Sequence, residues 1–499
     1  MIPTLVFGER VYAQDWMRAE IRRVLAGLHA LHCKEGDTVA VMLRNSPEYV
    51  ALVLACRQAG LYLASVNWHF KALEARHILE DSGARVLFVH EDLLASIQSG
   101  IPEGVAVVPV SAAAGSAEPS AWTRFGVGLA DMPPRTGFAH GAISYTSGTT
   151  GKPKGVRRIA APADQAGVME QQLQQVTDIV YGTGTDVTAF LAAPIYHSAA
   201  MAYLGHFCKL GATLVLEPRF DAERALALIA QHRVTHAYLV PTMYQRLLAL
   251  PSEARARHDL SSLRHVASTG SPCAVPLKQA MIDWLGPIVT EAYGSSEAGY
   301  TTFADAPSWQ RAPGSAGQPL PHADVRILDE DGQTLPANAM GLIYVRQRAV
   351  PDFSYINRPE ARSAIEREGL ITLGDMGYLN DEGFLFICDR KSDMVISGGV
   401  NIYPAEIESV LQTMPGVADC AVFGIPDAEF GEALAAAVQP RDGVQLRPAD
   451  VQAFLRERIA NYKVPRVVAL HDALPREDTG KIFKRLLREP YWAEQTRAI

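Results

Sequence analysis

The chain has 499 residues, of which 48% are hydrophobic and 20% are charged, an ordinary composition for a globular protein in water. A chain of this length can bury a large core, and we expect two or three structural units. Its net charge of −8 and its pI near 6.0 argue against nucleic acid or an anionic membrane as a partner. No apolar run approaches the roughly 18 residues that span a bilayer, and the first residues do not form a signal peptide, so we expect a cytoplasmic protein.

The cysteines are scattered along the chain without a Cys-x-x-Cys pair. This spacing predicts reduced, mostly buried thiols and does not favour a disulfide framework, a zinc site or a catalytic thiol. The six positions are Cys33, Cys56, Cys208, Cys273, Cys388 and Cys420.

The N-terminal part of the chain predicts a parallel sheet covered by helices, because apolar strands alternate with helical patterns. A small hairpin comes first, and Asn45-Ser46-Pro47 is suited to cap the second helix. Residues 111–137 are rich in Ala, Gly, Ser and Pro and predict a surface connection. The expected elements are a hairpin at 6–12, strands at 38–43, 61–66 and 85–89, and helices at about 15–31, 47–58 and 71–81.

The stretch from Ser144 to Val156 reads Ser-Tyr-Thr-Ser-Gly-Thr-Thr-Gly-Lys-Pro-Lys-Gly-Val and follows a short β-prone run. Glycines let successive backbone N–H groups face one anion, hydroxyls add donors, and Lys152 and Lys154 add positive charge. The stretch therefore predicts a polyphosphate cradle in a loop that leaves a strand. It is not a Walker A loop, because that spacing is absent and Pro153 follows Lys152, so a kinase or GTPase is disfavoured.

Beyond this loop the alternation of strands and helices resumes and then gives way to two other patterns. Residues 324–346 have an antiparallel pattern with Asp331-Gly332 as a hairpin turn, and a compact α+β unit begins near residue 391. The expected strands are 188–192, 213–216, 234–239, 263–267, 287–292, 418–423, 434–439 and 467–470, and the expected helices are one near Met201, one over 222–231 with Asp221 as its cap, and two over 404–412 and 448–459.

Four further polar motifs lie downstream of the phosphate loop. The first, Glu291-Ala292-Tyr293-Gly294-Ser295-Ser296-Glu297, follows a predicted strand, and the carboxyl ends of strands are where open sheets bind ligands. The others are Leu373-Gly374-Asp375-Met376-Gly377-Tyr378, the stretch Asp389 to Gly399 and the stretch Pro475 to Arg485.

Together with the phosphate loop, these motifs resemble those of the adenylate-forming superfamily, which includes acyl-CoA synthetases, luciferases and the adenylation domains of peptide synthetases. The resemblance runs through nearly the whole chain, although the N-terminus looks shorter than in most relatives. It implies an α/β fold with a large N-terminal domain over 1–391, made of helix-covered, mostly parallel sheets and a β-barrel-like part. A small mobile C-terminal α+β domain over 392–499 would follow, with its hinge at Ser392. The implied co-substrates and cofactor are ATP, coenzyme A and Mg²⁺.

The resemblance also implies roles for individual residues. Tyr293 would stack on adenine, Ser296 would bond a phosphate, and Glu297 would help to hold Mg²⁺, a hard cation that prefers oxygen ligands. Asp375 would hold both ribose hydroxyls, and Arg390 would reach the ribose and phosphate. The implied ATP- and AMP-binding residues are Thr146, Ser147, Gly148, Thr149, Thr150, Gly151, Lys152, Lys154, Gly270, Ser271, Tyr293, Gly294, Ser295, Ser296, Asp375, Arg390 and Lys481.

Catalysis would rest on Lys481, Glu297 and Thr146, since the substrate's own carboxylate is the first nucleophile and no Ser-His-Asp set is needed. By resemblance, Lys481 contacts the carboxylate and the α-phosphate during adenylation and is then withdrawn by rotation about Ser392. The implied CoA-binding residues are Ser397, Gly398 and Gly399.

Three positions depart from the family's usual residues. Ser296 replaces Thr and keeps its hydroxyl, Leu373 stands where relatives often have Thr, and Ser392 stands where the hinge is usually Asp or Lys. The last departure leaves the torsional behaviour of the hinge open.

The expected acyl pocket contains Tyr196, His197, Met201 and Gly270. The stretch Pro194 to Ser198 occupies the place where amino-acid-activating relatives have an Asp, and it contains no carboxylate. This favours a medium or long fatty acid, or a bulky steroid or aryl acid, without a charged ω-group.

Several alternatives remain at this stage. The acceptor could be a carrier protein in place of CoA, and an aryl-acid CoA ligase is a further variant of the same chemistry. A catalytically silent ATP-binding scaffold would be expected to lack Lys481 or Glu297, whereas both are present. A luciferase-like oxygenase is another use of the fold. The sequence names neither the acid nor the oligomeric state, with a homodimer among the options.

Overall fold

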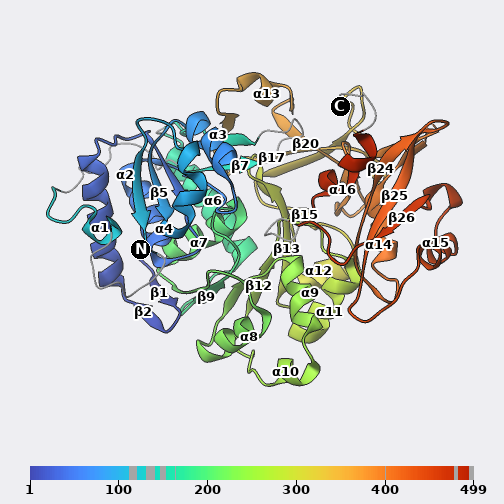
Figure 1. Cartoon of the computed structure of the whole chain (residues 1–499), viewed down its shortest axis with the longest axis horizontal. Coiled ribbons are helices and arrows are strands. Elements are labelled where there is room, and N and C mark those ends of the chain that lie inside the picture. Colours follow the sequence, from blue (N-terminus) through green and yellow to red (C-terminus); the bar gives the residue numbers. More distant parts are fainter. Residues whose placement is uncertain are drawn as a thin grey trace.

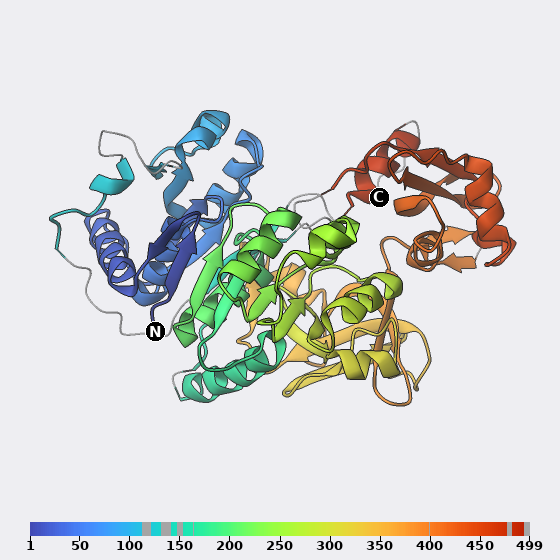
Figure 2. The same ribbon diagram turned by 90° about the horizontal axis from the view of Figure 1, so that it is seen from below.

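The computed structural model describes residues 1–111, 121–130, 141–146, 153–162, 164–398, 400–476 and 482–493. These described residues form four β-sheets. Figure 1 shows how the helices and strands are arranged. Figures 1 and 2 both show the C-terminal unit, coloured orange to red, at the opposite end of the molecule from helix α1 (Gln14–Ala30). The α/β architecture with a large N-terminal part and a small C-terminal part is therefore confirmed.

The first sheet has seven strands in the order β18-β8-β7-β4-β3-β5-β6 and contains the strand that precedes the phosphate loop. Its central strands are parallel, whereas β7, β8 and β18 form antiparallel pairs. Helix α2 (Pro47–Ala59) begins as predicted, since the Ser46 side chain accepts a hydrogen bond from the Tyr49 N–H. The strands are β3 (Thr38–Met42), β4 (Tyr62–Ser65), β5 (Ala84–His90), β6 (Ala106–Val110), β7 (Ala142–Thr146), β8 (Lys154–Arg158) and β18 (Phe353–Tyr355), and the other helices here are α3 (Ala72–Ser82) and α4 (Glu91–Ile97).

The second sheet has nine strands in the order β15-β14-β13-β12-β11-β9-β10-β1-β2. The strands from β13 to β1 run parallel and the hairpins β1–β2 and β13–β14 are antiparallel. Helix α8 is capped by Asp221, as predicted. The strands are β1 (Thr4–Phe7), β2 (Arg10–Tyr12), β9 (Thr188–Leu191), β10 (Thr213–Leu216), β11 (His236–Tyr238), β12 (His265–Ser268), β13 (Val289–Ser295), β14 (Gly299–Ala304) and β15 (Gln318–Pro319). The helices are α6 (Ala166–Tyr181), α7 (Ser198–Leu210), α8 (Ala222–Gln231), α9 (Pro241–Ala249), α10 (Ser252–Ala256), α11 (Val275–Leu285) and α12 (Ala306–Arg311).

The part expected to be barrel-like is a five-stranded sheet whose strands all pair in antiparallel fashion. Gly332 lies in a turn with a φ of +84°, as the Asp331-Gly332 pair predicted, although the following strand begins only at Gly341. The strands are β16 (Ala323–Leu328), β17 (Gly341–Gln347), β19 (Glu366–Arg367), β20 (Leu370–Leu379) and β21 (Leu385–Arg390), and helix α13 (Pro359–Ser363) lies beside them in the chain.

The fourth sheet lies in the C-terminal unit and has the order β23-β22-β25-β24, with β26 paired to β25. Apolar side chains of this unit form clusters of their own. The predicted hinge at Ser392 falls between β21 and β22, which belong to different sheets, and its mobility stays a prediction. The elements are β22 (Val395–Ser397), β23 (Val400–Ile402), β24 (Val417–Asp427), β25 (Gly431–Pro440), β26 (Val467–Leu470), α14 (Pro404–Leu411), α15 (Pro448–Arg456) and α16 (Lys484–Trp492).

Two features differ from the sequence expectations. Within the predicted surface connection 111–137, residues Ala121–Arg124 form helix α5, and the Trp122 side chain is buried with its ring centroid 6.0 Å from that of Phe88. The Trp122 side chain belongs to the core, because burial of an indole is strongly favourable. Residues 112–120 and 131–137 lie outside the described chain. Helix α6 was not predicted from the sequence. Its N-terminal half carries exposed apolar side chains such as Val168.

All six cysteines are free thiols. Within the described ranges, no helix combines the length and the apolar character that a bilayer crossing needs.

Candidate active site

A cavity of about 2260 Å³ lies where the first two sheets, the antiparallel sheet and the C-terminal unit meet. Its walls include the end of β7, the β13–β14 turn, one face of α7, Gly270 and Ser271 after β12, and Phe483 beside α16. Binding pockets for single small molecules usually hold roughly 300–1,000 Å³. This cavity therefore has room for more than one ligand.

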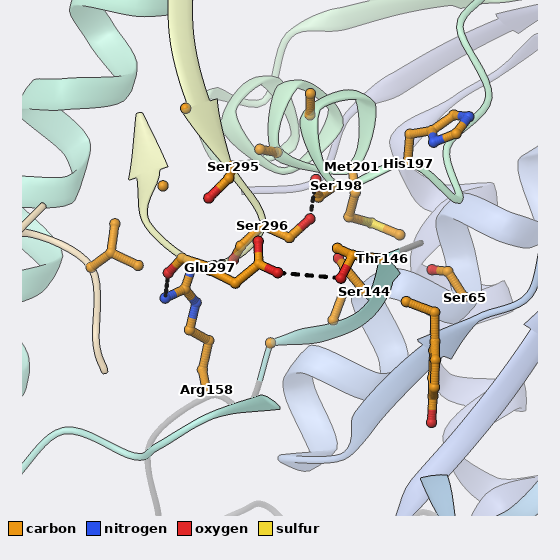
Figure 3. A pocket seen from close by; sticks show the side chains of 18 of the residues that line it. Ser65, Ser144, Thr146, Arg158, His197, Ser198, Met201, Ser295, Ser296 and Glu297 are labelled. Carbon is orange, nitrogen blue, oxygen red and sulfur yellow. Dashed lines mark hydrogen bonds between the residues drawn. The ribbon is translucent and has the colours of Figure 1, made fainter. Parts of the chain in front are cut away.

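Glu297 lies in the turn between β13 and β14 and points its carboxylate toward the end of β7 (Figure 3). Its Oε1 accepts hydrogen bonds from the Thr146 hydroxyl at 3.2 Å and the Tyr355 hydroxyl at 3.1 Å. Glu297 is only 5% exposed, yet it lines the cavity. Among the residues that the structure describes, Oε2 of Glu297 has no hydrogen-bond partner. One carboxylate oxygen is thus fixed by two hydroxyls.

The turn that carries Glu297 depends on close backbone packing. At Gly294, a Cβ atom would lie 2.2 Å from the Gly299 carbonyl oxygen, so only glycine fits there. The Ser295 hydroxyl accepts a hydrogen bond from the Ala298 N–H at 2.9 Å and closes the turn. The predicted motif is therefore the last part of β13 and its hairpin turn, not a loop that follows the strand.

Arg158, at the end of β8, holds the same turn from below, as Figure 3 shows. Its guanidinium donates to the carbonyl oxygens of Ser296 at 2.5 Å, Glu297 at 2.7 Å and Pro351 at 3.0 Å. Burial lowers the pKa of Arg158 to about 10, which still leaves the group charged at neutral pH. One partly buried cation thus ties the phosphate-loop hairpin to the Glu297 turn.

Ser296 faces the first turn of α7. Its hydroxyl donates to the hydroxyl of Ser198, the first residue of α7, at 2.9 Å. Figure 3 shows Ser198 and Met201 projecting from α7 toward Ser296 and Thr146, whereas His197 lies farther from Glu297. The N-terminus of α7 carries partial positive charge, which suits an anion in this part of the cavity.

Three residues predicted from three separate motifs meet beside the cavity. The Tyr293 hydroxyl donates to Oδ2 of Asp375 at 2.6 Å, and Nε of Arg390 donates to Oδ1 at 3.3 Å. Asp375 and Arg390 are also direct partners in the β20–β21 register. Burial raises the pKa of Tyr293, so its phenol keeps the proton that it donates. The cluster presents a buried carboxylate flanked by a phenol and a guanidinium.

The predicted acyl residues Tyr196, His197, Met201 and Gly270 all line the same cavity, and Ser271 lies next to Gly270. Tyr196 is largely buried at 8% exposure, and Gly270 has a φ of +93° that favours glycine. The four residues therefore share one cavity, and their role in binding an acyl group stays a prediction.

Other predicted residues lie at or beyond the edge of the cavity. The Lys154 ammonium lies 5.3 Å from the ring centroid of Tyr355, and Ser392 is exposed at the cavity rim. Ser397 and Gly398 do not line the cavity in this structure. Ser397 ends β22 in the C-terminal unit, and the N–H of the next residue, Gly398, donates to the Phe430 carbonyl.

Eight of the predicted residues lie outside the described part of the chain: Ser147, Gly148, Thr149, Thr150, Gly151, Lys152, Gly399 and Lys481. The structure does describe their neighbours. Thr146 and Lys154 are paired in the β7–β8 register, so the phosphate loop joins two adjacent antiparallel strands.

The described residues on either side of Lys481 make specific contacts. Arg476 and Ile482 form an antiparallel bridge, Arg476 pairs with Asp419, and Nζ of Lys484 lies 2.8 Å from Oε1 of Glu408. Burial disfavours the charged form of Lys484, but the carboxylates of Glu408 and Asp389 outweigh it and raise the pKa of Lys484. The described flanks of Lys481 are therefore anchored to the C-terminal unit by two ion pairs.

Comparison with known proteins shows which protein family has this combination of fold and site. Residues 6–351 match the family model of the AMP-binding enzymes, and residues 406–481 match the model of the AMP-binding enzyme C-terminal domain. The chain belongs to the AMP-binding enzyme family.

Curated members of the family extend over nearly the same length as this AMP-binding enzyme. A feruloyl-CoA synthase of an Amycolatopsis species is 36% identical, with 94% of this chain and 92% of that protein covered. A fatty acid–[acyl-carrier-protein] ligase of Streptomyces coeruleorubidus is 30% identical, with 100% and 95% covered. A long-chain-fatty-acid–CoA ligase of Mycobacterium tuberculosis is 31% identical, with 97% and 93% covered.

Solved structures of the family give the same picture. ATP-bound MatB from Rhodopseudomonas palustris superposes with a TM-score of 0.86 at 28% identity, over 98% of this chain and 96% of that one. An o-succinylbenzoate coenzyme A synthetase from Bacillus subtilis, in complex with ATP and a magnesium ion, gives 0.82 at 29% identity over 97% and 96%. The AMP-binding enzyme described here is therefore an acid–thiol ligase of the AMP-forming type.

Sequence reasoning missed three residues of this enzyme's site. Arg158 lies two residues after the phosphate-loop motif, but no strand was predicted there and its role was not recognised. Tyr355 and Ser198 gave no signal, because a tyrosine in a short strand and a serine at a helix start are common in any fold.

Proposed function

We propose that the protein is an acyl-CoA synthetase that activates an apolar carboxylic acid with ATP and transfers the acyl group to coenzyme A. The observation that carries this proposal is the Glu297 carboxylate, which two hydroxyls orient at the point where the phosphate loop leaves β7. The Asp375 cluster lies at the same cavity and offers a carboxylate of the kind that accepts two hydroxyl hydrogen bonds.

Mg²⁺ fits the donor set around Glu297. In the described ranges, no group of three or more His, Cys, Asp or Glu side chains could hold a metal ion. Mg²⁺ is commonly held by one or two carboxylates together with substrate phosphates. We infer that Glu297, with Thr146 beside it, would hold the ion, which would supply positive charge to the phosphates when bound.

The chain's own residues would then align the reactants. In the first step a carboxylate oxygen of the acid bonds to the α-phosphorus of ATP, and the bond from that phosphorus to pyrophosphate breaks. Lys481 and the phosphate-loop donors would stabilise the charge on phosphorus, and Asp375 and Tyr293 would fix the ribose and adenine. In the second step the CoA sulfur bonds to the acyl carbon, AMP leaves, and the thiol proton is lost to solvent.

The second step would need a different face of the C-terminal unit. Ser397, Gly398 and Gly399 are proposed to contact the pantetheine arm, and Ser397 and Gly398 lie away from the cavity in this structure. Rotation at Ser392 would withdraw the Lys481 segment and bring β22 toward the acyl-adenylate. This rotation, the domain boundary at residue 392, a homodimeric state and a cytoplasmic location are all proposals.

For the acid, the pocket favours a medium or long fatty acid or a bulky apolar aryl acid. Tyr196, Met201, Ala199 and Ala202 give the cavity apolar walls next to Ser198. Both a feruloyl-CoA synthase and a long-chain-fatty-acid–CoA ligase match this chain over most of its length, at 36% and 31% identity. An aryl acid therefore stands beside a fatty acid as the substrate.

A carrier protein is the second candidate acceptor, because a relative at 30% identity is a fatty acid–[acyl-carrier-protein] ligase. The test supplies purified enzyme with ATP, Mg²⁺ and a panel of fatty and aryl acids, and offers either CoA or a phosphopantetheinylated carrier protein. We expect acyl-CoA and AMP in equal amounts. A thioester formed only on the carrier protein would overturn the CoA assignment, and AMP production without any thioester would overturn both.

A further inference from the structure

One face of α7 lines the cavity while the opposite face is packed into the core. Ser198, Met201, Ala202, Gly205 and Lys209 all face the cavity, at a spacing that places them along one side of a helix. On the other side, three large side chains are fully buried: Tyr203, Leu204 and Phe207. The helix is therefore anchored on one side and presents mostly small residues on the other.

Gly205 lies in the middle of this helix without a packing reason for glycine. Glycine inside a helix costs stability relative to alanine, and it is usually explained by a close neighbour that excludes a Cβ atom. A Cβ atom on Gly205 would meet no heavy atom within 4 Å, whereas a Cβ atom on Gly27 in α1 would lie 2.4 Å from the Phe125 ring. The glycine at position 205 thus leaves space open and does not relieve a contact.

The open space at Gly205 belongs to a slot between three helices. We give this name to the part of the cavity that residues of α2, α6 and α7 line, with Met169 and Leu173 from α6 and Val53 and Cys56 from α2. The polar side chains of Gln174 and Thr177 in α6 line the cavity as well.

The three helices are linked by charged side chains: Nζ of Lys209 lies 3.0 Å from Oε1 of Glu170, and Arg57 also approaches Glu170 at 4.0 Å. The slot is thus lined by both apolar and polar side chains and has charged groups where the three helices approach one another.

The distance from the reacting site sets the length of the occupant. Ser198 begins α7 and bonds Ser296 at the Glu297 turn, and Gly205 lies seven residues further along the same helix. At a rise of 1.5 Å per residue, this is about 10 Å along the helix axis. An acid with only a few carbon atoms would not reach that depth.

We propose that Gly205 is a specificity-determining residue that keeps the α2–α6–α7 slot open for the far part of the acyl group. The class of substrate is an acid with an apolar body that extends two turns along α7, whether a long chain or a fused or substituted ring system. This inference rests on the proposed function, which placed the acyl group beside Met201 but did not say how far along α7 the acyl group extends. Short-chain acids are predicted to be poor substrates.

The test compares the wild type with Gly205→Ala, Gly205→Leu and the control Gly167→Leu. Gly167 is also a helical glycine whose added Cβ atom would meet no heavy atom within 4 Å, but it lies on the exposed side of α6 and does not line the cavity. Acid-dependent pyrophosphate release is measured for straight-chain acids from butanoate to hexadecanoate and for aryl acids. Melting temperature is measured for each variant.

The expected result is a shift of substrate range without loss of stability. Gly205→Leu should lower kcat/KM for the largest accepted acids by about tenfold or more and leave butanoate unchanged, with Gly205→Ala intermediate. The melting temperature of Gly205→Ala should rise, because a better helix former replaces glycine without a clash. Gly167→Leu should keep the wild-type acid profile.

Three outcomes would overturn the inference: a wild type that prefers butanoate, an unchanged acid profile in Gly205→Leu, or a lower melting temperature in Gly205→Ala, which would indicate a packing role. Failure of the proposed function is distinguishable, because the wild type would then release no pyrophosphate with any acid. In that event calorimetric titration with hexadecanoate decides the inference. Weaker binding to Gly205→Leu than to Gly167→Leu supports the slot, and equal binding or no binding to the wild type overturns it.

Discussion

Thr146 donates a hydrogen bond to Glu297, with Oγ1 and Oε1 3.2 Å apart, although 151 positions separate the two residues in the chain. The bond joins the phosphate-loop hairpin of the first sheet to the β13–β14 turn of the second sheet. Because Tyr355 donates to the same Oε1, one oxygen of Glu297 is occupied and its orientation is fixed. A fixed carboxylate at this place is what the proposed magnesium role requires.

The first prediction concerns Tyr355. Tyr355→Phe removes one of the two donors to Glu297, so the carboxylate becomes less well oriented and the Mg²⁺ concentration for half-maximal activity should rise by about tenfold. Glu297→Gln should abolish adenylation at any Mg²⁺ concentration. Magnesium titrations of pyrophosphate release measure both effects, with Tyr378→Phe as a control, since that ring stacks on Phe386 in β21. An unchanged titration curve for Tyr355→Phe would contradict this role.

The second prediction concerns Arg158. Arg158→Met leaves the carbonyl oxygens of Ser296, Glu297 and Pro351 without their donor, which should destabilise the fold by about 2–4 kcal/mol and lower adenylation at least about tenfold. Arg158→Lys should restore part of the stability and part of the adenylation activity. Denaturant unfolding and pyrophosphate release are measured side by side.

A matched control for Arg158 is its neighbour Arg157, whose guanidinium lies 4.1 Å from the ring centroid of Tyr62. Arg157→Met should have a much smaller effect on adenylation. If Arg157→Met and Arg158→Met lowered adenylation equally, the proposed link between Arg158 and the Glu297 turn would be wrong.

The third prediction concerns the ion pair that anchors the segment next to Lys481. Lys484→Met removes the partner of the buried Glu408 carboxylate, so Lys481 should be positioned less well. Adenylation should fall about tenfold, while thioester formation from supplied acyl-AMP should be retained. Lys463→Met is the control, because Lys463 pairs with Glu406 at 2.6 Å on the same unit. An equal loss in both half-reactions would instead indicate general destabilisation of the C-terminal unit.

The fourth prediction is a loss of stability in mild acid that originates in buried histidines. Burial lowers the pKa of His90 and of His236 to about 4 each, and it also lowers the pKa of His206 and His265. With a pKa of about 4, His90 and His236 are neutral in the folded protein above that pH, whereas in the unfolded chain they take up protons below about pH 6.5. The unfolded state therefore binds more protons between pH 6.5 and 4, and stability falls as the pH falls through that window.

The size of this effect follows from the same linkage. For His90 and His236 the loss at pH 5 relative to neutral pH is about 2 kcal/mol each. Melting temperatures from pH 8 to pH 5 measure this loss of stability. In His236→Gln the melting temperature should depend less on pH, because the contribution of His236 is removed. A melting temperature independent of pH in this range, or one that rises on acidification, would contradict the neutral state of these side chains.

Much of the fold followed from local sequence patterns. The Ser46-Pro47 start of α2 and the Asp221 cap of α8 were predicted because capping is a local interaction between neighbours. Helix α6 was not predicted, although Met169, Leu173, Val176 and Val180 recur at helical spacing in its sequence. The burial of Trp122 was also missed, because its packing against Phe88 is a tertiary contact that the small residues around it in the sequence do not indicate.

The site was predictable where one motif carries its own chemistry, and less so where partners come from distant segments. Glu297, Asp375 and Arg390 were all identified from their motifs, and the structure brings Asp375 and Arg390 together. Arg158 and Tyr355 were not identified, because their contribution is to hold Glu297 from other strands. These two side chains reach Glu297 because of the strand register and the sheet order, which no local sequence pattern specifies.

The most direct test of the account is carboxylate-dependent exchange of labelled pyrophosphate into ATP by the wild type and by Lys481→Ala, followed by thioester formation from supplied acyl-AMP. The account predicts exchange by the wild type with at least one large apolar acid, loss of exchange by about a hundredfold or more in Lys481→Ala, and retained thioester formation in that variant. Wild-type protein that exchanges pyrophosphate with no acid, or Lys481→Ala protein that exchanges as fast as the wild type, would contradict it.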